Sequence, residues 1–228
     1  MGSSVKYILL TPKTWHTTLF RELSAQKPEE WLHIDRKEDF TVEKLNEVKP
    51  QYIFIPHWSY IIPKDIFENY TCVVFHMTDL PYGRGGSPLQ NLIVNGHTET
   101  KISAIKVEEG LDTGPVYLKR PVSLYGTAEE IFIRMAVIIK GMIEEIIVNN
   151  TQPVAQQGEA VVFKRRKPED SNIAQLETLE QVYDYIRMLD CEGYPNAFVE
   201  AGNFRFEFKR ASLQGDESII ADVRITKK

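Results

Sequence analysis

One histidine and one aspartate hold positions that suit acid–base chemistry. His76 ends an apolar run and begins a segment rich in Gly and Pro, and Asp112 follows 36 positions later, between Leu111 and Thr113. Histidine exchanges protons near neutral pH, with an unperturbed pKa of about 6.5. A neighbouring carboxylate can hold the ring in one tautomer and stabilise its charged form. The pair therefore suits a reaction in which an attacking group loses a proton.

Each of the two residues also has a purely structural interpretation. A single histidine at a strand end more often makes a structural hydrogen bond than takes part in catalysis. Asp-Thr-Gly is a common turn, because Asp bonds to the nearby backbone and Gly adopts positive φ easily. The pair becomes informative only together with the elements that would position it.

The elements around the pair predict an α/β fold with a mostly parallel sheet. Short apolar runs alternate with segments of helical spacing, which is typical of a sheet covered by helices on both faces. Ligands bind outside the carboxyl ends of the strands in such sheets, and His76 is expected at one of those ends. A long amphipathic helix is expected at 127–148. Strands are expected at 5–10, 30–34, 52–55, 72–75, 101–107 and 114–120.

Changes in composition along the sequence predict that the chain has three parts. We expect a main N-terminal domain at 1–150, a connector at 151–177 and a small C-terminal β-rich subdomain at 178–228. A chain of 228 residues, 43% of them hydrophobic, is long enough for one sizeable core and a small second domain.

Composition limits the partners and the location that we expect. The formal net charge of −5 argues against a large nucleic-acid partner, because phosphate binding needs a basic face. The basic run 164–167 is the main counter-evidence, but Glu169 and Asp170 balance it, so we favour a solvated connector over a phosphate patch. No signal peptide or long apolar stretch is evident, so we expect a cytoplasmic protein. The spacing of its residues suits no catalytic metal.

The segment around the pair resembles the folate-dependent formyltransferases, whose members act on methionyl-tRNA, on glycinamide ribonucleotide or on amino sugars. Members of that family carry a strand ending in Asn-x-His, then a Leu-Pro, Arg-Gly and Pro loop, and then Leu-Asp-x-Gly. The matching residues here are His76, Leu80, Pro81, Arg84, Gly85, Pro88, Leu111, Asp112, Thr113 and Gly114. The resemblance implies a Rossmann-like formyltransferase domain at 1–150.

The resemblance also implies a donor and a set of site residues. The donor is 10-formyltetrahydrofolate and no metal is involved, with His76 as oxyanion donor or acid–base group and Asp112 as its orienter and proton acceptor. Met77, Thr78, Arg84 and Gly85 are expected to contact the acceptor substrate. The isoleucines of the folate set fit a core role equally well, and that alternative stays open. The expected folate contacts are Ser59, Tyr60, Ile61, Ile62, Ile66, Val107, Glu108, Glu109 and Gly110.

One departure from the family pattern bears on activity. Val74 stands where the family has the Asn that helps to bind the formyl oxygen. Loss of one such donor typically costs about 2.7–4 kcal/mol of transition-state stabilisation. His57, Thr78 and Asn91 are possible substitutes, and the sequence does not choose between them. A catalytically degenerate relative that binds folate is therefore an alternative to an active enzyme.

The sequence around His76 favours a nucleotide-linked amino sugar as acceptor. The segments 75–88 and 186–190 look most like sugar N-formyltransferases of bacterial nonulosonic-acid pathways, especially that of pseudaminic acid biosynthesis. That enzyme acts on a UDP-linked 4-amino-4,6-dideoxy sugar, and its products decorate flagellin. Methionyl-tRNA is the alternative acceptor. Short length, negative charge and the absence of a Gly-rich turn after the first strand argue against it. The oligomeric state is not predicted.

Overall fold

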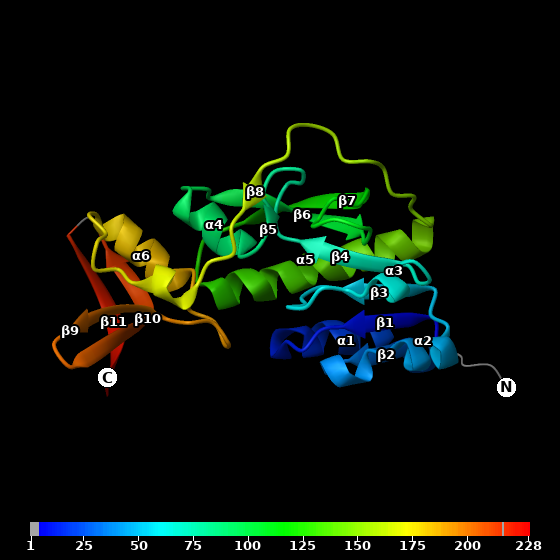
Figure 1. The fold of residues 1–228 in the computed structure, drawn as a ribbon, viewed down its shortest axis with the longest axis horizontal. Coiled ribbons are helices and arrows are strands. Elements are labelled where there is room, and N and C mark those ends of the chain that lie inside the picture. Colours follow the sequence, from blue (N-terminus) through cyan, green and yellow to red (C-terminus); the bar gives the residue numbers. More distant parts are fainter. Residues whose placement is uncertain (1–4, 216) are drawn as a thin grey trace. The chain divides into compact units, whose positions relative to one another are not determined.

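The computed structural model describes residues 5–215 and 217–228, whose helices and strands are drawn in Figure 1. Residues 1–4 of the predicted main domain and residue 216 of the predicted subdomain lie outside the described residues. The described chain forms two compact units. The first comprises 5–84, Lys101–Val122 and Ile133–Val162, and the second comprises Gly85–Thr100, Ser123–Phe132 and the described part of 163–228.

The main sheet has six strands and confirms the predicted α/β fold. β1 lies parallel to β2 and to β3, β3 lies parallel to β4, and β4 lies antiparallel to β6. The sheet is therefore mostly parallel, as the alternation of apolar runs and helical segments predicts. In spatial order the strands are β2 (Trp31–Ile34), β1 (Tyr7–Leu10), β3 (Tyr52–Ile55), β4 (Cys72–His76), β6 (Glu99–Lys106) and β7 (Val116–Ser123).

Six α-helices and four short 3-10 helices accompany the strands of the described chain. Thr41 begins α2 as an N-cap, because its hydroxyl accepts a hydrogen bond from the Lys44 backbone. No helix among the described residues combines the length and the apolar content that a bilayer crossing needs. The α-helices are α1 (Thr17–Ser24), α2 (Val42–Val48), α3 (Lys64–Phe67), α4 (Pro88–Val94), α5 (Ala128–Asn149) and α6 (Leu179–Arg187). The 3-10 helices are η1 (Thr14–His16), η2 (Pro28–Glu30), η3 (Lys37–Asp39) and η4 (Pro168–Ser171).

Both faces of the main sheet are covered by helices. On one face, Leu45 and Val48 of α2 and Ile66 of α3 join a buried apolar cluster with Ile8 and Ile53 of the strands. Burying each such side chain stabilises the fold by about 1.5–3 kcal/mol. Because strand residues alternate between faces, the residues between them point to the opposite side.

Helices α1 and α5 cover that opposite side within the first unit. Phe20 of α1 stacks on His33 of β2, with ring centroids 5.0 Å apart. Lys140 of α5 lies 3.8 Å from Glu22 of α1, so the two helices are neighbours. The sheet is thus rigid on both sides, which fixes the positions of the strand ends.

In the second unit, polar bonds to backbone carbonyls connect segments that lie far apart in the sequence. Arg187, which is 7% exposed, donates to the carbonyls of Leu124 and Gly126 at 2.6 and 3.0 Å. Gln90 of α4 donates to the carbonyl of Met188 at 3.1 Å. This unit also holds the predicted C-terminal β-rich region, an antiparallel sheet of β9 (Ala197–Ala201), β10 (Phe204–Gln214) and β11 (Ser218–Lys227). A two-stranded sheet pairs β5 (Arg84–Gly85) with β8 (Val162–Phe163).

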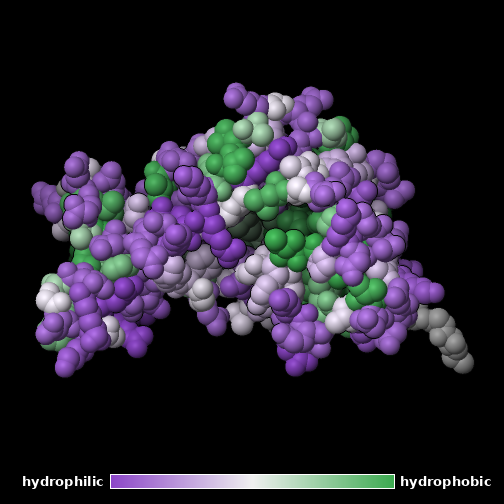
Figure 2. Space-filling view, in the orientation of Figure 1, coloured by the Kyte–Doolittle hydropathy of each residue, from purple (hydrophilic) through white to green (hydrophobic). Residues whose placement is uncertain are grey.

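The surface is mainly hydrophilic, with apolar side chains exposed in patches on the face that Figure 2 draws.

The division of the sequence into 1–150, 151–177 and 178–228 stays a prediction, for which limited proteolysis is the direct test.

Buried histidines lie near the carboxyl ends of the strands. His16 is 2% exposed, and its Nδ1 lies 2.8 Å from the Thr11 hydroxyl. Burial, and then the neighbouring His57, His33 and Lys13, lower the pKa of His16 to about 3. An unfolded chain takes up a proton on this ring near pH 6.5, whereas the folded protein does not. The contribution of His16 to stability is therefore complete above pH 6.5 and is lost as the pH falls toward 3.

We predict that His16→Asn flattens the acid side of the stability profile. Asn keeps a polar atom near the Thr11 hydroxyl but does not titrate. The slope of the unfolding free energy between pH 6.5 and 4 should fall by up to about 1.4 kcal/mol per pH unit. Urea unfolding at a series of pH values measures this slope. An unchanged slope would contradict the assignment.

Candidate functional site

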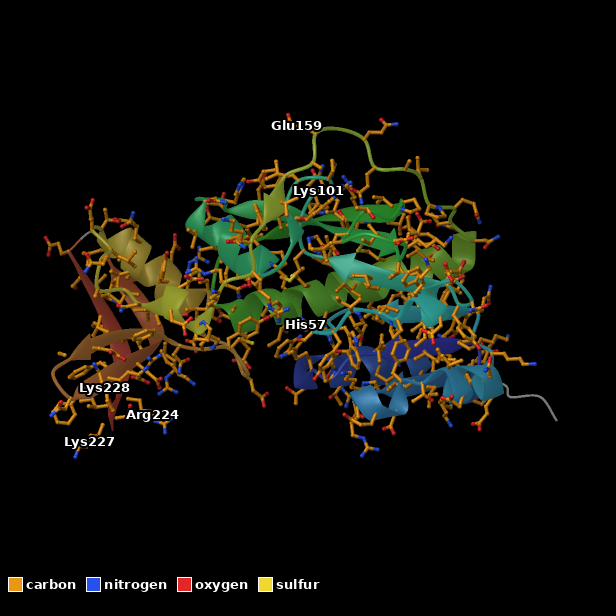
Figure 3. The ribbon with its side chains drawn as sticks, in the orientation of Figure 1. His57, Lys101, Glu159, Arg224, Lys227 and Lys228 are labelled. Carbon is orange, nitrogen blue, oxygen red and sulfur yellow. The ribbon has the colours of Figure 1, made fainter. Side chains whose placement is uncertain are left out.

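His76 lies at the carboxyl end of the parallel part of the sheet. It is the last residue of β4, two residues after Val74, which pairs with Ile55 of β3. His57 comes two residues after Ile55, so the register places both histidines at the same edge. Figure 3 shows His57 at the end of β3. Ligands bind at this edge in sheets of this kind.

The His76 ring is fixed by the loop that follows it. The ring is 7% exposed, and its Nε2 lies 2.8 Å from the Gly83 carbonyl oxygen. A carbonyl can only accept, so Nε2 carries the hydrogen and donates it. In the neutral ring the lone pair is then on Nδ1. Nδ1 is therefore the atom that can take up a proton.

The structure brings Asp112 to that atom. Asp112 Oδ2 lies 3.5 Å from His76 Nδ1. This distance is longer than a good hydrogen bond, but it becomes an ion pair once Nδ1 is protonated. The carboxylate side chain is 16% exposed, so water screens the pair only partly. The two groups together form a proton-accepting site.

The turn that carries Asp112 has an unusual backbone. Asp112 adopts a φ of +53°, which non-glycine residues rarely do and which Asp tolerates better than most. A Cβ on Gly114 would lie 1.8 Å from the Lys106 carbonyl oxygen, so only glycine fits beside β6. The Asp-Thr-Gly sequence is thus explained both by the turn and by the contact with His76.

Of the four predicted acceptor-substrate contacts, Thr78 and Arg84 make hydrogen bonds in the structure. Met77 and Thr78 are buried, and the Thr78 hydroxyl lies 3.3 Å from the Gly83 carbonyl oxygen, to which it donates. Arg84 donates to the side chain of Gln156. In the second unit, a Cβ on Gly85 would lie 2.4 Å from the carbonyl oxygen of Phe163. These contacts account for the residue types, and a role in binding the acceptor stays a prediction.

The possible substitutes for the family Asn differ in their surroundings. Val74 packs against the apolar cluster of the first unit and offers no donor. The Thr78 hydroxyl already donates to Gly83, and within the second unit the Asn91 amide donates to the carbonyls of Gly86 and Lys164. Burial and then the charge of Lys13 lower the pKa of His57 to about 4, so this ring is neutral at pH 7.

The two predicted folate segments lie beside each other. Lys64, within the first segment, lies 3.5 Å from Glu109 of the second. Tyr60 and Ile61 are 51% and 90% exposed, so their apolar surfaces are open to a flat ring. Ile62 and Ile66 are instead buried members of the core, which favours the structural alternative for these two side chains.

The remaining folate positions that follow β6 begin beside Cys72, the first residue of β4. The backbone of Val107 donates to the Cys72 carbonyl at 2.9 Å, while Ser59, Glu108 and Gly110 are exposed. The folate contacts stay a prediction. Among the described residues no group of three or more His, Cys, Asp or Glu side chains is placed to hold a metal ion.

The role of one residue near Asp112 could not be predicted from the sequence. Gln156 lies in the predicted connector, and its amide nitrogen donates to the carbonyl oxygens of Asp112 and Gly114. A single amide in a polar stretch has no periodicity or motif that could have revealed it. Only the fold, which brings this part of the chain back to the Asp112 turn, reveals the residue.

Two family models match parts of the chain. The chain matches the family model described as formyl transferase over residues 23–136, which is half of its length. It also matches the model described as the methionyl-tRNA formyltransferase C-terminal domain over residues 168–226.

Individual relatives cover the chain to different extents. A solved structure described as methionyl-tRNA formyltransferase from Clostridium thermocellum is 52% identical, with a TM-score of 0.95, over 98% of this chain and 100% of that one. A methionyl-tRNA formyltransferase of Ehrlichia ruminantium is 29% identical over 183 residues, which are 78% of this chain and 59% of that protein. The chain spans little more than half the length of the curated relatives it matches.

These matches correct the expected acceptor. A solved sugar N-formyltransferase from a Shewanella species is only 14% identical, with a TM-score of 0.67 over 98% of each chain, so it shares the fold alone. The predicted nucleotide-sugar acceptor, the pseudaminic acid pathway and the exclusion of nucleic acid were therefore wrong. The segment 75–88 misled because its residues build the support of His76 itself, which does not distinguish one amine from another.

This chain belongs to the formyl transferase family, because a formyl transferase model matches half of its sequence and a relative is 52% identical to it over 98% of this chain.

Proposed function

We propose that this protein transfers the formyl group of 10-formyltetrahydrofolate to the amino group of methionyl-tRNA. The observation that carries the proposal is the meeting of His76 Nδ1 and Asp112 Oδ2 at the carboxyl edge of the sheet. The choice of acceptor is supported by the 52% identity to a methionyl-tRNA formyltransferase. A catalytically degenerate folate-binding relative is the second candidate, because Val74 replaces the family Asn.

The geometry of the pair suits the proton transfers that this reaction needs. The neutral amine attacks the formyl carbon, and its nitrogen must lose a proton as the tetrahedral intermediate forms. His76 Nδ1 takes that proton, while Gly83 holds Nε2 and keeps the ring in place. The Asp112 carboxylate then stabilises the imidazolium. The bond from carbon to folate nitrogen N10 breaks, and His76 returns the proton to that nitrogen.

Exposed apolar groups in the same unit as the pair suit a folate. Tyr60 and Ile61 belong to the same unit as His76, and the Leu111 side chain next to Asp112 is 63% exposed. Lys37 lies over the Tyr60 ring at 4.6 Å, so a cation is also at hand for an anionic tail. A flat heterocycle needs such apolar surface with backbone polar groups at one edge.

The basic run 164–167 suits a tRNA backbone. Lys164, Arg165 and Lys167 are exposed, and Arg166 stacks on the Tyr185 ring at 5.1 Å. The Asp170 carboxylate accepts from the Lys167 backbone at 2.8 Å, so it is used to cap η4. Local charge matters more than the net charge of the chain for binding phosphates.

We predict that His76→Ala and Asp112→Asn each lower formyl transfer by at least about 100-fold, the low end for acid–base groups. Release of tetrahydrofolate measures the rate, and circular dichroism checks the fold. Asp39→Asn, at an exposed aspartate of η3, is the matched control and should keep the wild-type rate. A rate near wild type in either site variant would exclude the assigned roles.

We predict that, with 10-formyltetrahydrofolate present, aminoacylated initiator tRNA becomes formylated. Acid gels or mass spectrometry of the aminoacyl group report the product. A UDP-linked 4-amino sugar serves as the comparison acceptor and should remain unmodified. Formylation of the sugar alone would refute the proposed acceptor. Folate binding without turnover on either amine would favour the degenerate relative.

We predict that neutralising the exposed members of the basic run weakens tRNA binding. Replacing Lys164, Arg165 and Lys167 by Gln should raise KM for tRNA and leave kcat unchanged. The salt dependence of binding should become shallower, by roughly 0.7–0.9 in the log–log slope for each phosphate that is no longer neutralised. The same substitutions at exposed Lys27, Arg36 and Lys44 provide the control. Equal effects in both triple variants would argue against phosphate binding at this run.

A further inference from the structure

We infer that Gln156 is a positioning residue for the reaction, because it holds the Asp112 turn against the loop that fixes His76. This inference rests on the proposed function, since it concerns the same histidine and carboxylate. Gln156 lies in a segment that the sequence predicts as a connector. It acts on the site through the backbone of Asp112, and the inference assigns it no contact with either substrate.

The amide group of Gln156 bonds to both sides of the Asp112 turn. Its nitrogen lies 2.8 Å from the Asp112 carbonyl oxygen and 2.8 Å from the Gly114 carbonyl oxygen. An amide NH₂ has two hydrogens, so one side chain can satisfy both carbonyls. The peptide between Asp112 and Thr113 and the peptide between Gly114 and Pro115 are thereby fixed.

The oxygen of the same amide bonds to the loop after His76. Gln156 Oε1 accepts from Arg84 Nε at 3.2 Å and from Nη2 at 2.7 Å. This pattern also fixes which way the amide points, because the opposite orientation would set its oxygen against two carbonyls and its NH₂ against a guanidinium. Arg84 directly follows Gly83, whose carbonyl holds His76 Nε2. One side chain therefore connects the peptides that orient the two reacting groups.

The path of the main chain brings Gln156 to this place. Val154 and Val116 exchange two backbone hydrogen bonds, of 2.7 and 2.9 Å. The segment after α5 thus runs beside the start of β7, two residues before Gln156 and two residues after Gly114. Gln156 is half-buried there, whereas its neighbour Gln157 is exposed.

The Asp112 turn needs such a support. Its φ of +53° is a conformation that persists where the surroundings determine it. Leu111 and Thr113 on either side are exposed, so the turn has little packing of its own. Rotation of the Asp112 peptide would swing the carboxylate away from Nδ1. A displacement of about 1 Å in a catalytic group can cost on the order of 100-fold in rate.

The test compares Gln156→Leu with Gln157→Leu in the full-length protein. The expected result for Gln156→Leu is a fall in kcat of about 10- to 100-fold, with KM for folate and for tRNA changed less than about twofold. Gln157→Leu should match wild type. Gln156→Glu keeps the acceptor for Arg84 but loses both donors to the turn, so it should fall as Gln156→Leu does. Gln156→Glu also carries the test if the leucine variant does not fold.

A second measurement separates this inference from the proposed function. The His76 ring nitrogens, observed by ¹⁵N NMR, should shift in both Gln156 variants and stay unchanged in Gln157→Leu, whichever amine the protein formylates. If the wild-type protein transferred no formyl group, the proposed function would be refuted. The difference in ring signals between the Gln156 variants and Gln157→Leu would still be expected. Unchanged ring signals, or wild-type kcat in Gln156→Glu, would overturn the role of Gln156.

Discussion

The hydrogen bond from His76 Nε2 to the Gly83 carbonyl determines what this site can do. It assigns the ring hydrogen to the nitrogen that faces the loop, and it leaves the basic nitrogen facing Asp112. A ring free to rotate would expose either nitrogen. The neighbouring contacts serve this arrangement, since the Thr78 hydroxyl donates to the same carbonyl and Arg84 ties the next residue to Gln156. The chemistry thus depends on a loop that is held both by its own hydrogen bonds and by bonds to other parts of the chain.

Much of the fold could be predicted because its cause lies in local patterns. Short apolar runs at 5–10, 52–55 and 72–75 are long enough only for strands, and helical spacing separates them. The parallel order of the sheet follows from that alternation. The hydrophobic period does not reveal which loops return to the sheet. The bonds of Gln156 depend on the course of the chain after α5, and no repeat in the sequence encodes it.

The site could be predicted in part, for a related reason. The motif around His76 and Asp112 reflects the requirements of tautomer, turn and close packing in this chain. The acceptor is not specified there. The charge of the whole chain misled because it averages over both units, so it does not reveal a local cluster such as the basic run 164–167. The sequence also does not reveal that the Thr78 hydroxyl donates to the Gly83 carbonyl inside the loop.

The position of Gln156 in the chain has a consequence for how this protein can vary. A fragment that stopped at the end of α5 would retain every strand of the six-stranded sheet and both His76 and Asp112, yet it would lack the amide that joins their supports. Insertions or deletions between Val154, which pairs with Val116, and Gln156 would move that amide away from the Asp112 turn, although no group that meets a substrate had changed. The stretch of chain that looks most dispensable is thus one whose length is constrained.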